Sequence, residues 1–337
     1  WPAINNISTW TSVAIYVLGV AWISDNVEGI TVGVLIAMTS YIGRFWAPVN
    51  TLASFYNSLL TAVSYLERIF ETIDEPVTVK DIEGAVDMPQ IQGEVEFKDV
   101  NFSYENGVQI LNNVNFKANV GDSIAIVGPT GAGKTTIINL ISRFYNLDSG
   151  LITIDGIDIS KVTIKSLRKQ MGVMLQDSFT FSGTIMDNIR YGNMEATDEQ
   201  VIKAAKIVRA HDFIEELERG YKTEVNERGT RLSVGQRQLI SFARALLADP
   251  KILILDEATS SIDTETEVLL QEGLSHLLAN RTSFIIAHRL STIKNSTAIM
   301  YIDKGVIQEM GSHDELIKLR GKYYELYMSQ YKFLEEK

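Results

Sequence analysis

One eight-residue stretch constrains the fold of this chain more than any other: Gly128-Pro129-Thr130-Gly131-Ala132-Gly133-Lys134-Thr135. It fits the phosphate-loop pattern G-x-x-x-x-G-K-[ST] at every fixed position. The apolar run 123–127 before it has the composition of a buried parallel strand, and residues 136–141 after it read as a helix. The sequence therefore predicts a strand–loop–helix unit rather than a glycine-rich turn that binds nothing.

The predicted loop has the chemistry of a polyphosphate site. Its glycines let the backbone turn so that amide groups converge, and the positive end of the following helix dipole favours an anion. Lys134 would contact the outer phosphates and Thr135 would bind Mg²⁺. The residues that we assign to this cradle are Gly128, Pro129, Thr130, Gly131, Ala132, Gly133, Lys134, Thr135 and Thr136.

Composition excludes several other classes of protein. The 337 residues allow about two domains, and a net charge of −11 does not favour nucleic-acid binding. The chain has no cysteine, which excludes disulfides and thiol chemistry, and its four histidines are too few for a histidine-rich metal site. Because it begins at Trp1 with neither methionine nor a basic leader, we expect it to be part of a longer protein.

The first 66 residues contain only three charges: Asp25, Glu28 and Arg44. Residues 1–24 have about the length of a membrane-spanning helix, and the polar turn 25–29 lacks the lysine or arginine typical of the cytoplasmic side. A second helix over 31–72 would be about 60 Å long, twice the thickness of the hydrocarbon layer. We therefore expect a transmembrane hairpin at 1–73, with a buried hairpin of a soluble protein as the alternative.

Residues 74–92 read as a linker, because prolines, glycines and mixed charges replace the apolar pattern. From residue 93 the pattern is that of a globular domain, with half-exposed strands expected at 95–97, 100–104 and 114–116. Later apolar runs alternate with helical patterns, which predicts an α/β core with a largely parallel sheet. Those runs are 151–155, 172–175, 252–256 and 283–287.

Residues 177–249 interrupt this alternation and predict a subdomain made only of helices. Two stretches in it, Thr197–Gln200 and Ser233–Gln236, have the spacing of a capping box at a helix start. Near the end of the chain, two short strands at 299–302 and 306–309 flank a turn, and the sequence from Ser312 is helical with a break at Gly321.

The apolar run 252–255 ends in two acidic residues, Asp256 and Glu257. A buried parallel strand would deliver them to the edge of the sheet where ligands bind. Asp256 would hold Mg²⁺, and Glu257 would orient or deprotonate a water for attack on the terminal phosphorus. Without the phosphate loop, the same pattern would describe equally well a strand end with solvated acids.

The stretch Leu232-Ser233-Val234-Gly235-Gln236 opens a helix that runs to Leu247. Free amides at a capped helix start form a second anion site, which suggests that two chains share each nucleotide. From the residues alone, an ordinary helix cap is the better interpretation.

The ordered set of motifs resembles the ATP-binding cassette (ABC) family. It runs from the phosphate loop through Gln176, the LSVGQ stretch and the ILILDE strand to Ser261-Ile262-Asp263 and His288. Together with the apolar helices, it resembles a half-transporter of an exporter, of which residues 1–73 correspond to the last two of six helices. The resemblance implies an α/β P-loop ATPase fold with an antiparallel β-subdomain and a helical subdomain, preceded by all-α transmembrane helices.

The resemblance also assigns roles to single residues. Tyr104 would stack on adenine, and Gln176 would sense Mg²⁺ and the attacking water. Ser233, Gly235 and Gln236 would contact the nucleotide held by a partner chain. Asp263 would cross between the two ATP sites, His288 would contact the γ-phosphate, and residues 224–229 would signal to the membrane helices. Catalysis would fall to Glu257, His288, Gln176 and Lys134, and Mg²⁺ would be held by Thr135, Gln176 and Asp256.

The resemblance therefore implies an ATP-hydrolysing half of an exporter in the cell membrane, with its nucleotide domain at 93–337 in the cytoplasm. Its partners would be a second half-transporter, membrane lipid and a small-molecule, lipid or peptide cargo, with no nucleic acid. Val234 departs from the commonest signature, which has glycine there. Two alternatives remain open: a regulatory half with little hydrolysis of its own, and a soluble ABC ATPase.

Overall fold

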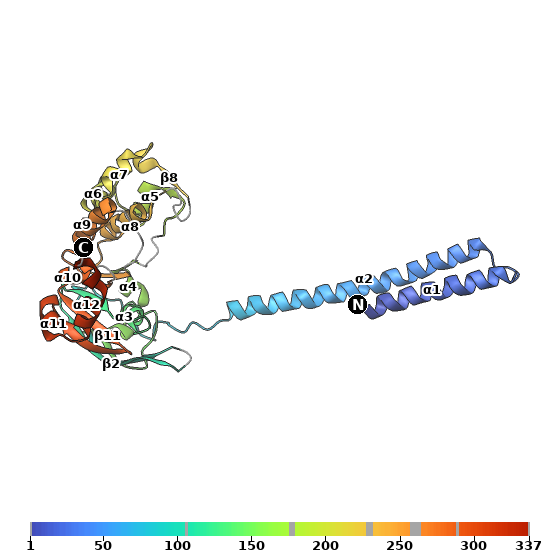
Figure 1. Cartoon of the computed structure of the whole chain (residues 1–337), viewed down its shortest axis with the longest axis horizontal. Coiled ribbons are helices and arrows are strands. Elements are labelled where there is room, and N and C mark those ends of the chain that lie inside the picture. Colours follow the sequence, from blue (N-terminus) through green and yellow to red (C-terminus); the bar gives the residue numbers. More distant parts are fainter. Residues whose placement is uncertain are drawn as a thin grey trace. The chain divides into compact units, whose positions relative to one another are not determined.

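The computed structural model describes residues 2–104, 107–174, 179–226, 232–256, 264–287 and 290–335. The chain forms two compact units, Trp1–Val77 and Thr78–Lys337. The first unit is a pair of helices and the second is built around β-sheets (Figure 1). Each unit is described below by itself.

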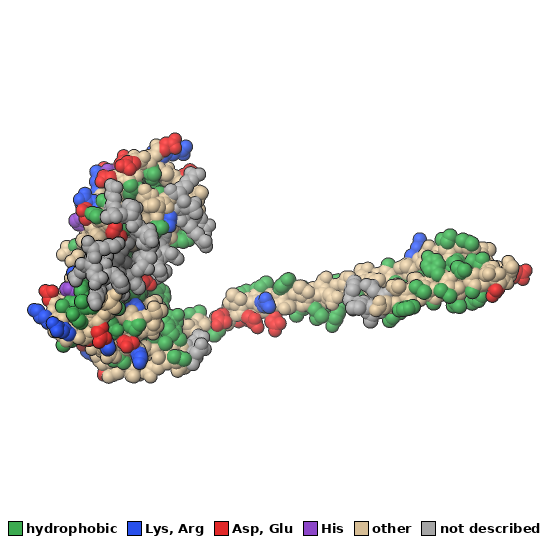
Figure 2. Space-filling model, viewed as in Figure 1, with side chains coloured by type: hydrophobic (Ala, Val, Ile, Leu, Met, Phe, Trp, Pro, Cys, Tyr) green, Lys and Arg blue, Asp and Glu red, His purple; other side chains and the backbone are tan. Residues whose placement is uncertain are grey.

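The first unit consists of α1 (Pro2–Ser24) and α2 (Val32–Ile73), joined by a short turn. Both helices are long and apolar enough to cross a membrane, and Figure 2 shows apolar side chains spread along them among uncharged atoms. The helices pack closely at Gly19, where a Cβ atom would lie 2.4 Å from Leu35 Cδ1. Thr31 caps α2 by accepting a hydrogen bond from the Val34 amide at 3.3 Å.

Hydroxyl side chains in these apolar helices are bonded to the helix backbone itself. Thr11 donates to the Ile7 carbonyl at 2.7 Å, and Thr51 donates to the Ala47 carbonyl at 3.0 Å. Such bonds satisfy a polar group without water. They allow threonine and serine in a helix whose surroundings supply few hydrogen-bond partners.

The second unit contains a six-stranded sheet that is parallel except at one edge, where β11 and β12 are antiparallel. Its strands, in spatial order, are β12 (Val306–Gly311), β11 (Ala298–Asp303), β3 (Ser123–Val127), β10 (Thr282–Ile286), β9 (Ile252–Asp256) and β6 (Met171–Met174). The predicted α/β core with a largely parallel sheet is confirmed.

A four-stranded antiparallel sheet lies in the same unit. Its order is β2 (Gln109–Ala118), β1 (Val95–Ser103), β4 (Ser149–Ile154) and β5 (Ile157–Asp158). The predicted strands at 95–97 and 100–104 form the single strand β1, whose register shifts after Phe97 where Asp99 has a φ of 49°. The expectation that 151–155 belongs to the parallel core is wrong, because β4 pairs antiparallel with β1.

The helices of the second unit are α3 (Lys134–Ile141), α4 (Ile164–Arg168), α5 (Ile185–Arg190), α6 (Asp198–Ile207), α7 (His211–Glu216), α8 (Val234–Ala248), α9 (Thr264–Leu278), α10 (Leu290–Asn295), α11 (His313–Leu319) and α12 (Lys322–Glu335). Four of them, α5 to α8, fall in the predicted helical insertion. That insertion also contains the short antiparallel pair β7 (Gly183–Thr184) and β8 (Glu224–Val225), so the expectation of helices only is wrong. The pair is too short to leave an alternating pattern.

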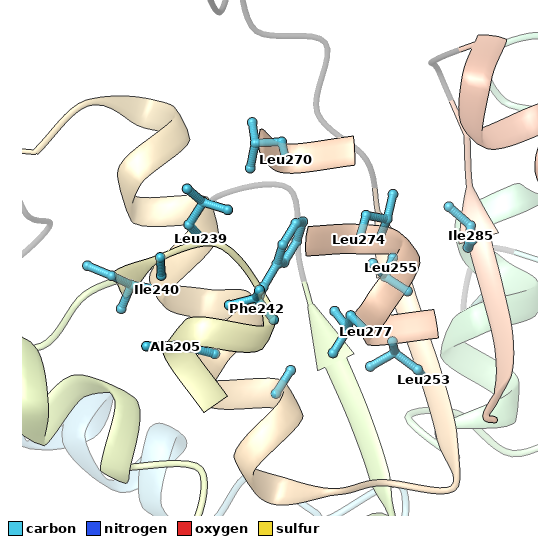
Figure 3. Packing of buried hydrophobic residues seen from close by; sticks show 14 of the residues in the cluster. Ala205, Leu239, Ile240, Phe242, Leu253, Leu255, Leu270, Leu274, Leu277 and Ile285 are labelled. Atoms are coloured by element: carbon cyan, nitrogen blue, oxygen red, sulfur yellow. The ribbon is translucent and has the colours of Figure 1, made fainter. Parts of the chain in front are cut away.

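Two hydrophobic clusters cover the two faces of the six-stranded sheet. Along β3, Ala125 and Val127 belong to one cluster, while Ile124 and Ile126 belong to the other. Both faces of the strand are thus buried, as expected for a parallel sheet in an α/β protein. Figure 3 shows part of the first cluster, in which side chains of α8 and α9 pack with those of β9 and β10. This packing fixes the strand ends that carry the candidate site.

Candidate nucleotide-binding site

The loop between β3 and α3 requires glycine at particular positions. Gly128 has a φ of 146°, and a Cβ atom there would lie 2.0 Å from the carbonyl oxygen of Ile302. Gly133 has a φ of 103°, and a Cβ atom would lie 2.8 Å from Leu111 Cδ2. Gly131 has a φ of 80° but open space around it. Left-handed backbone and crowding by neighbouring strands therefore both exclude side chains from this loop.

The first turn of α3 has no side-chain cap, because its N-cap residue is Gly133. The first amides of a helix have no partner within the helix and need one from elsewhere. Here they follow a glycine loop at the positive end of the helix dipole, which is the geometry of an anion site. The predicted strand 123–127 and the helix after the loop are both confirmed, with α3 beginning two residues earlier than expected.

The Lys134 side chain folds back over the loop. Its Nζ donates to the carbonyl oxygens of Gly128 and Pro129, each at 2.9 Å. Partial burial lowers the pKa of the ammonium, while the Asp256 carboxylate opposes that shift by favouring the charged form. The structure thus keeps a cation at the mouth of the cradle and places Asp256 within its electrostatic reach.

Asp256 is half-buried at the carboxyl end of β9, and β10 lies between β9 and the phosphate-loop strand β3. The Thr135 side chain is exposed at the start of α3. A magnesium ion bound with a nucleotide needs only one or two protein ligands, because phosphates and water complete its octahedron. One carboxylate and one hydroxyl fit that requirement. The described residues contain no group of three or more histidine or acidic side chains that would form a metal site of protein ligands alone.

Tyr104 follows β1 and its side chain is held in three ways. Its hydroxyl lies 3.2 Å from Thr136 Oγ1, and Thr136 is buried in the first turn of α3. The rings of Phe102 and Tyr145 lie edge-on to it, with centroids at 4.9 and 5.0 Å. The structure thus joins two predicted site residues, Tyr104 and Thr136. Tyr145 was not among the predicted site residues, and an aromatic residue just past a helix gives no distinctive signal.

The start of α8 has the predicted capping box. The Gln236 amide donates to Ser233 Oγ at 3.1 Å, and the Ser233 amide donates to Gln236 Oε1 at 3.0 Å. The Ser233 side chain is exposed and Gly235 is buried. Val234 is 43% exposed, so its side chain points away from the helix interior and leaves the helix start intact.

Several predicted residues lie outside the described part of the chain. These are Gln176, Glu257, Asp263, His288 and positions 227–229 of the predicted signalling segment. Their roles stay predictions.

A phosphate loop between a parallel strand and an uncapped helix, with an antiparallel sheet and a helical insertion around it, defines an ABC-type P-loop nucleotide-binding fold. The family model described as "ABC transporter" matches residues 111–260, and the chain belongs to this family.

Individual relatives carry the similarity further along the chain. An uncharacterized ABC transporter ATP-binding protein, YknV of Bacillus subtilis, is 52% identical over 90% of this chain and 50% of its own length. A fatty acid ABC transporter ATP-binding/permease protein of Mycobacterium bovis is 45% identical over 96% of this chain and 51% of its own length. The chain thus spans about half the length of these curated relatives.

A solved structure, that of a bacterial Atm1-family ABC exporter with ATP bound, superposes with a TM-score of 0.74. It is 36% identical and covers 98% of this chain and 58% of its own. The similarity therefore includes the helical first unit as well as the nucleotide-binding fold.

Proposed function

We propose that this chain is the C-terminal part of an ATP-hydrolysing half of an ABC exporter. One combined observation carries the proposal: a phosphate cradle with an uncapped helix start occurs in the same chain as two long apolar helices. The similarity to exporter and permease proteins over more than 90% of the chain supports it. ATP would be bound in the second unit, and the first unit would lie in the membrane.

The proposed division assigns residues 1–73 to the last transmembrane helices, 74–92 to a linker and 93–337 to the nucleotide-binding domain. Within that domain, the helical subdomain would occupy 177–249. We place the protein in the cell membrane with its nucleotide domain in the cytoplasm, since the polar turn at 25–29 lacks basic residues.

Within the site, the amides of the glycine loop and the Lys134 ammonium would hold the phosphates of ATP. Thr135, Asp256 and Gln176 would hold Mg²⁺, which neutralises phosphate charge when bound. Glu257 would orient and deprotonate the attacking water, and His288 would stabilise charge at the γ-phosphate. Tyr104 would stack on the adenine ring.

The start of α8 supports a shared site. Ser233, Gly235 and Gln236 would face the nucleotide held by a second half-transporter, and Asp263 would lie between the two sites. Closure of the two halves on ATP would rearrange the membrane helices, and hydrolysis would reset them. The cargo would be a small molecule, lipid or peptide, and the M. bovis relative is named as a fatty acid transporter.

Replacing Glu257 tests the hydrolytic role. Glu257→Gln should keep ATP affinity and lower ATP turnover by roughly 10²–10⁴-fold, because a general base contributes about that factor. The control is Glu272→Gln, which makes the same chemical change on α9. Glu272 forms an exposed ion pair with Arg209, and its replacement should leave turnover unchanged. Turnover of the Glu257 variant at the wild-type rate would refute its role as base, and a wild-type protein that binds ATP without hydrolysing it would favour the regulatory alternative.

A further inference from the structure

Residues 78–92, which we call the strap, are bonded to the surface of the nucleotide-binding unit. Val86 forms a parallel bridge with Val162, in which its amide donates to the Lys161 carbonyl at 3.2 Å. Met88 and Ile91 are buried, with 5% and 1% of their surface exposed. The strap is therefore part of the folded unit and does not behave as free chain.

Side chains of the nucleotide-binding unit satisfy the strap's backbone along its length. Asn146 donates to the Thr78 carbonyl at 3.1 Å, near the start of the strap. Further on, the Met88 amide donates to Ser166 Oγ at 2.7 Å, and the Ile91 amide donates to Gln170 Oε1 at 2.9 Å. These bonds leave only residues 74–77 between the end of α2 and the first fastened position.

Arg143 contacts the strap at Lys80 and Asp81, just after the Asn146 contact. Its guanidinium donates to the Val162 carbonyl at 2.5 Å and to the Lys80 carbonyl at 3.2 Å. The Asp81 carboxylate lies 3.7 Å away, and it also accepts from the Ile164 amide at 2.8 Å. Arg143 is 3% exposed, so its bond to the Val162 carbonyl is shielded from water and is stronger than a surface contact, whereas the Asp81 side chain is 41% exposed.

Arg143 occupies a backbone position at the end of α3 where glycine is usual. Its amide donates to the Leu140 carbonyl at 3.0 Å, and the Phe144 amide donates to the Asn139 carbonyl at 2.9 Å, which together close α3 in a Schellman motif. Arg143 occupies the left-handed position of that motif with a φ of 51°, where glycine is usual. Glycine would adopt this backbone without strain, so a glycine substitution here removes the side chain and leaves the helix end intact.

We propose that Arg143 is a positioning residue that fastens the strap to the end of the phosphate-loop helix. The proposal rests on the function proposed above. Arg143 holds Lys80 and Asp81, which leaves only residues 74–79 free when the exposed Asn146–Thr78 bond opens. Without Arg143, Asp81 keeps only its exposed bond to the Ile164 amide. When that bond opens, the next bonds begin at Val86 and leave residues 74–85 free, which doubles the maximal span from about 20 Å to about 40 Å. A short tether passes a displacement of the phosphate-loop helix to α2, whereas a long flexible one absorbs it.

Arg143→Gly is the matched test, because glycine keeps the left-handed helix end and removes only the side chain. In hydrogen–deuterium exchange of the full-length protein without nucleotide, peptides covering 78–88 should exchange roughly 10- to 100-fold faster in this variant. Arg320→Gly is the control: Arg320 has a φ of 53° at the end of α11, but its side chain is exposed. Equal exchange of the strap in Arg143→Gly and wild type would contradict the proposal that Arg143 fastens it.

Asp81→Asn provides a milder second variant that keeps the oxygen bonded to Ile164 and removes the charge opposite Arg143. It should accelerate exchange of the same peptides by a few-fold. Faster exchange in Arg143→Gly with wild-type exchange in Asp81→Asn would still support fastening by Arg143. It would show that the bonds to the Val162 and Lys80 carbonyls are sufficient. Wild-type exchange in both variants would reject fastening by Arg143.

The positioning role needs a readout of the membrane helices. The chain has no cysteine, so Glu71→Cys near the end of α2 gives a specific spin-label site once any cysteine elsewhere in the full-length protein is replaced. In the dimer, ATP with vanadate should shift the label–label distance in the wild type and leave it unshifted and broad in Arg143→Gly. A ten-residue Gly-Ser insertion after Val77, with Arg143 intact, should reproduce that loss.

These outcomes separate the two proposals. If the ATP-dependent change in label–label distance is retained in Arg143→Gly despite faster strap exchange, Arg143 fastens the strap but does not position α2. A wild-type protein with no ATP-dependent shift and no ATP binding would overturn the proposed function, while the exchange result, measured without nucleotide, would stand by itself.

Discussion

The first backbone amides of α3 and of α8 are bonded in different ways. At α3 the N-cap is Gly133, which has no side chain to offer the first amides. At α8, Ser233 and Gln236 cap each other's amides reciprocally. One helix start therefore depends on an external acceptor, while the other is stable by itself and presents an exposed hydroxyl.

This difference suggests a division of labour within the shared site. The uncapped, glycine-preceded start of α3 carries a cation, Lys134, and can bind a polyphosphate on its own. The capped start of α8 has one amide already occupied by Ser233, and the cation beside it, Arg237, donates to the Leu232 carbonyl at 2.6 Å. We infer that α3 supplies most of the affinity for ATP, and that α8 adds contacts only when a second chain brings it to the nucleotide.

Removing the cation at α3 should have the largest effect. Lys134→Met should lower ATP turnover by roughly 10²–10³-fold, the scale of losing one donor to developing phosphate charge. Lys203→Met removes the same charge from an exposed position on α6 and should have no effect on turnover. Steady-state ATPase assays on wild type and the two variants measure turnover. Wild-type turnover in Lys134→Met would show that the cation at α3 does not contribute to hydrolysis.

Two alanine substitutions in the glycine loop before α3 should separate the cost of backbone strain from the cost of steric crowding. Gly128→Ala should destabilise the protein by about 3 kcal/mol or more, because it adds both a left-handed alanine and a clash with the Ile302 carbonyl. Gly131→Ala has open space and should lose only about 1–2 kcal/mol from backbone strain. Urea unfolding of the two variants provides the comparison. Equal losses would mean that crowding by β11 does not shape the cradle.

The start of α8 should show the smallest change in stability, with a separable change in activity. Ser233→Asp keeps an oxygen that caps α8, so unfolding should shift by no more than about 0.5 kcal/mol. Its negative charge would repel a phosphate of the partner's nucleotide and should lower ATP turnover about tenfold or more. Thr197→Asp is the control, since Thr197 caps α6 with the same kind of box.

In contrast, Ser233→Ala should destabilise the protein by about 0.5–2 kcal/mol, because the cap is lost. Thermal unfolding and ATPase assays on the three variants separate the two roles. If Ser233→Asp hydrolyses ATP at the wild-type rate, Ser233 acts only as a helix cap.

Local signals in the sequence predicted local structure well. The strand 123–127, both capping boxes and the break at Gly321 are confirmed, because each depends on residues within one turn. The fold class is confirmed too. The strand at 151–155 was assigned to the wrong sheet, since a short apolar run reads the same in a parallel and an antiparallel sheet.

Features that depend on distant contacts left no readable pattern. The β7–β8 pair joins residues 40 and 42 positions apart, with only two residues in each strand. Tyr145 meets Tyr104 only because α3 returns the chain to the end of β1. The bonds that fasten the strap connect positions 62–83 residues apart, such as Arg143 with Asp81 and Ile164 with Asp81. Of the site, the phosphate loop could be read from the sequence, whereas the surroundings that orient it could not.

The most direct test of the central claim counts tightly bound ATP in mixed dimers of the full-length protein, purified through two different affinity tags. In one dimer, Lys134→Met and Ser233→Asp lie on different chains; in the other, both lie on one chain and the partner is wild type. If α3 of one chain and α8 of the other share each nucleotide, the first dimer keeps one intact site and retains one ATP after gel filtration. In the second dimer both sites are damaged, so the wild-type α3 binds ATP only weakly and none is retained. The reverse result, with ATP bound only by the second dimer, would contradict the account.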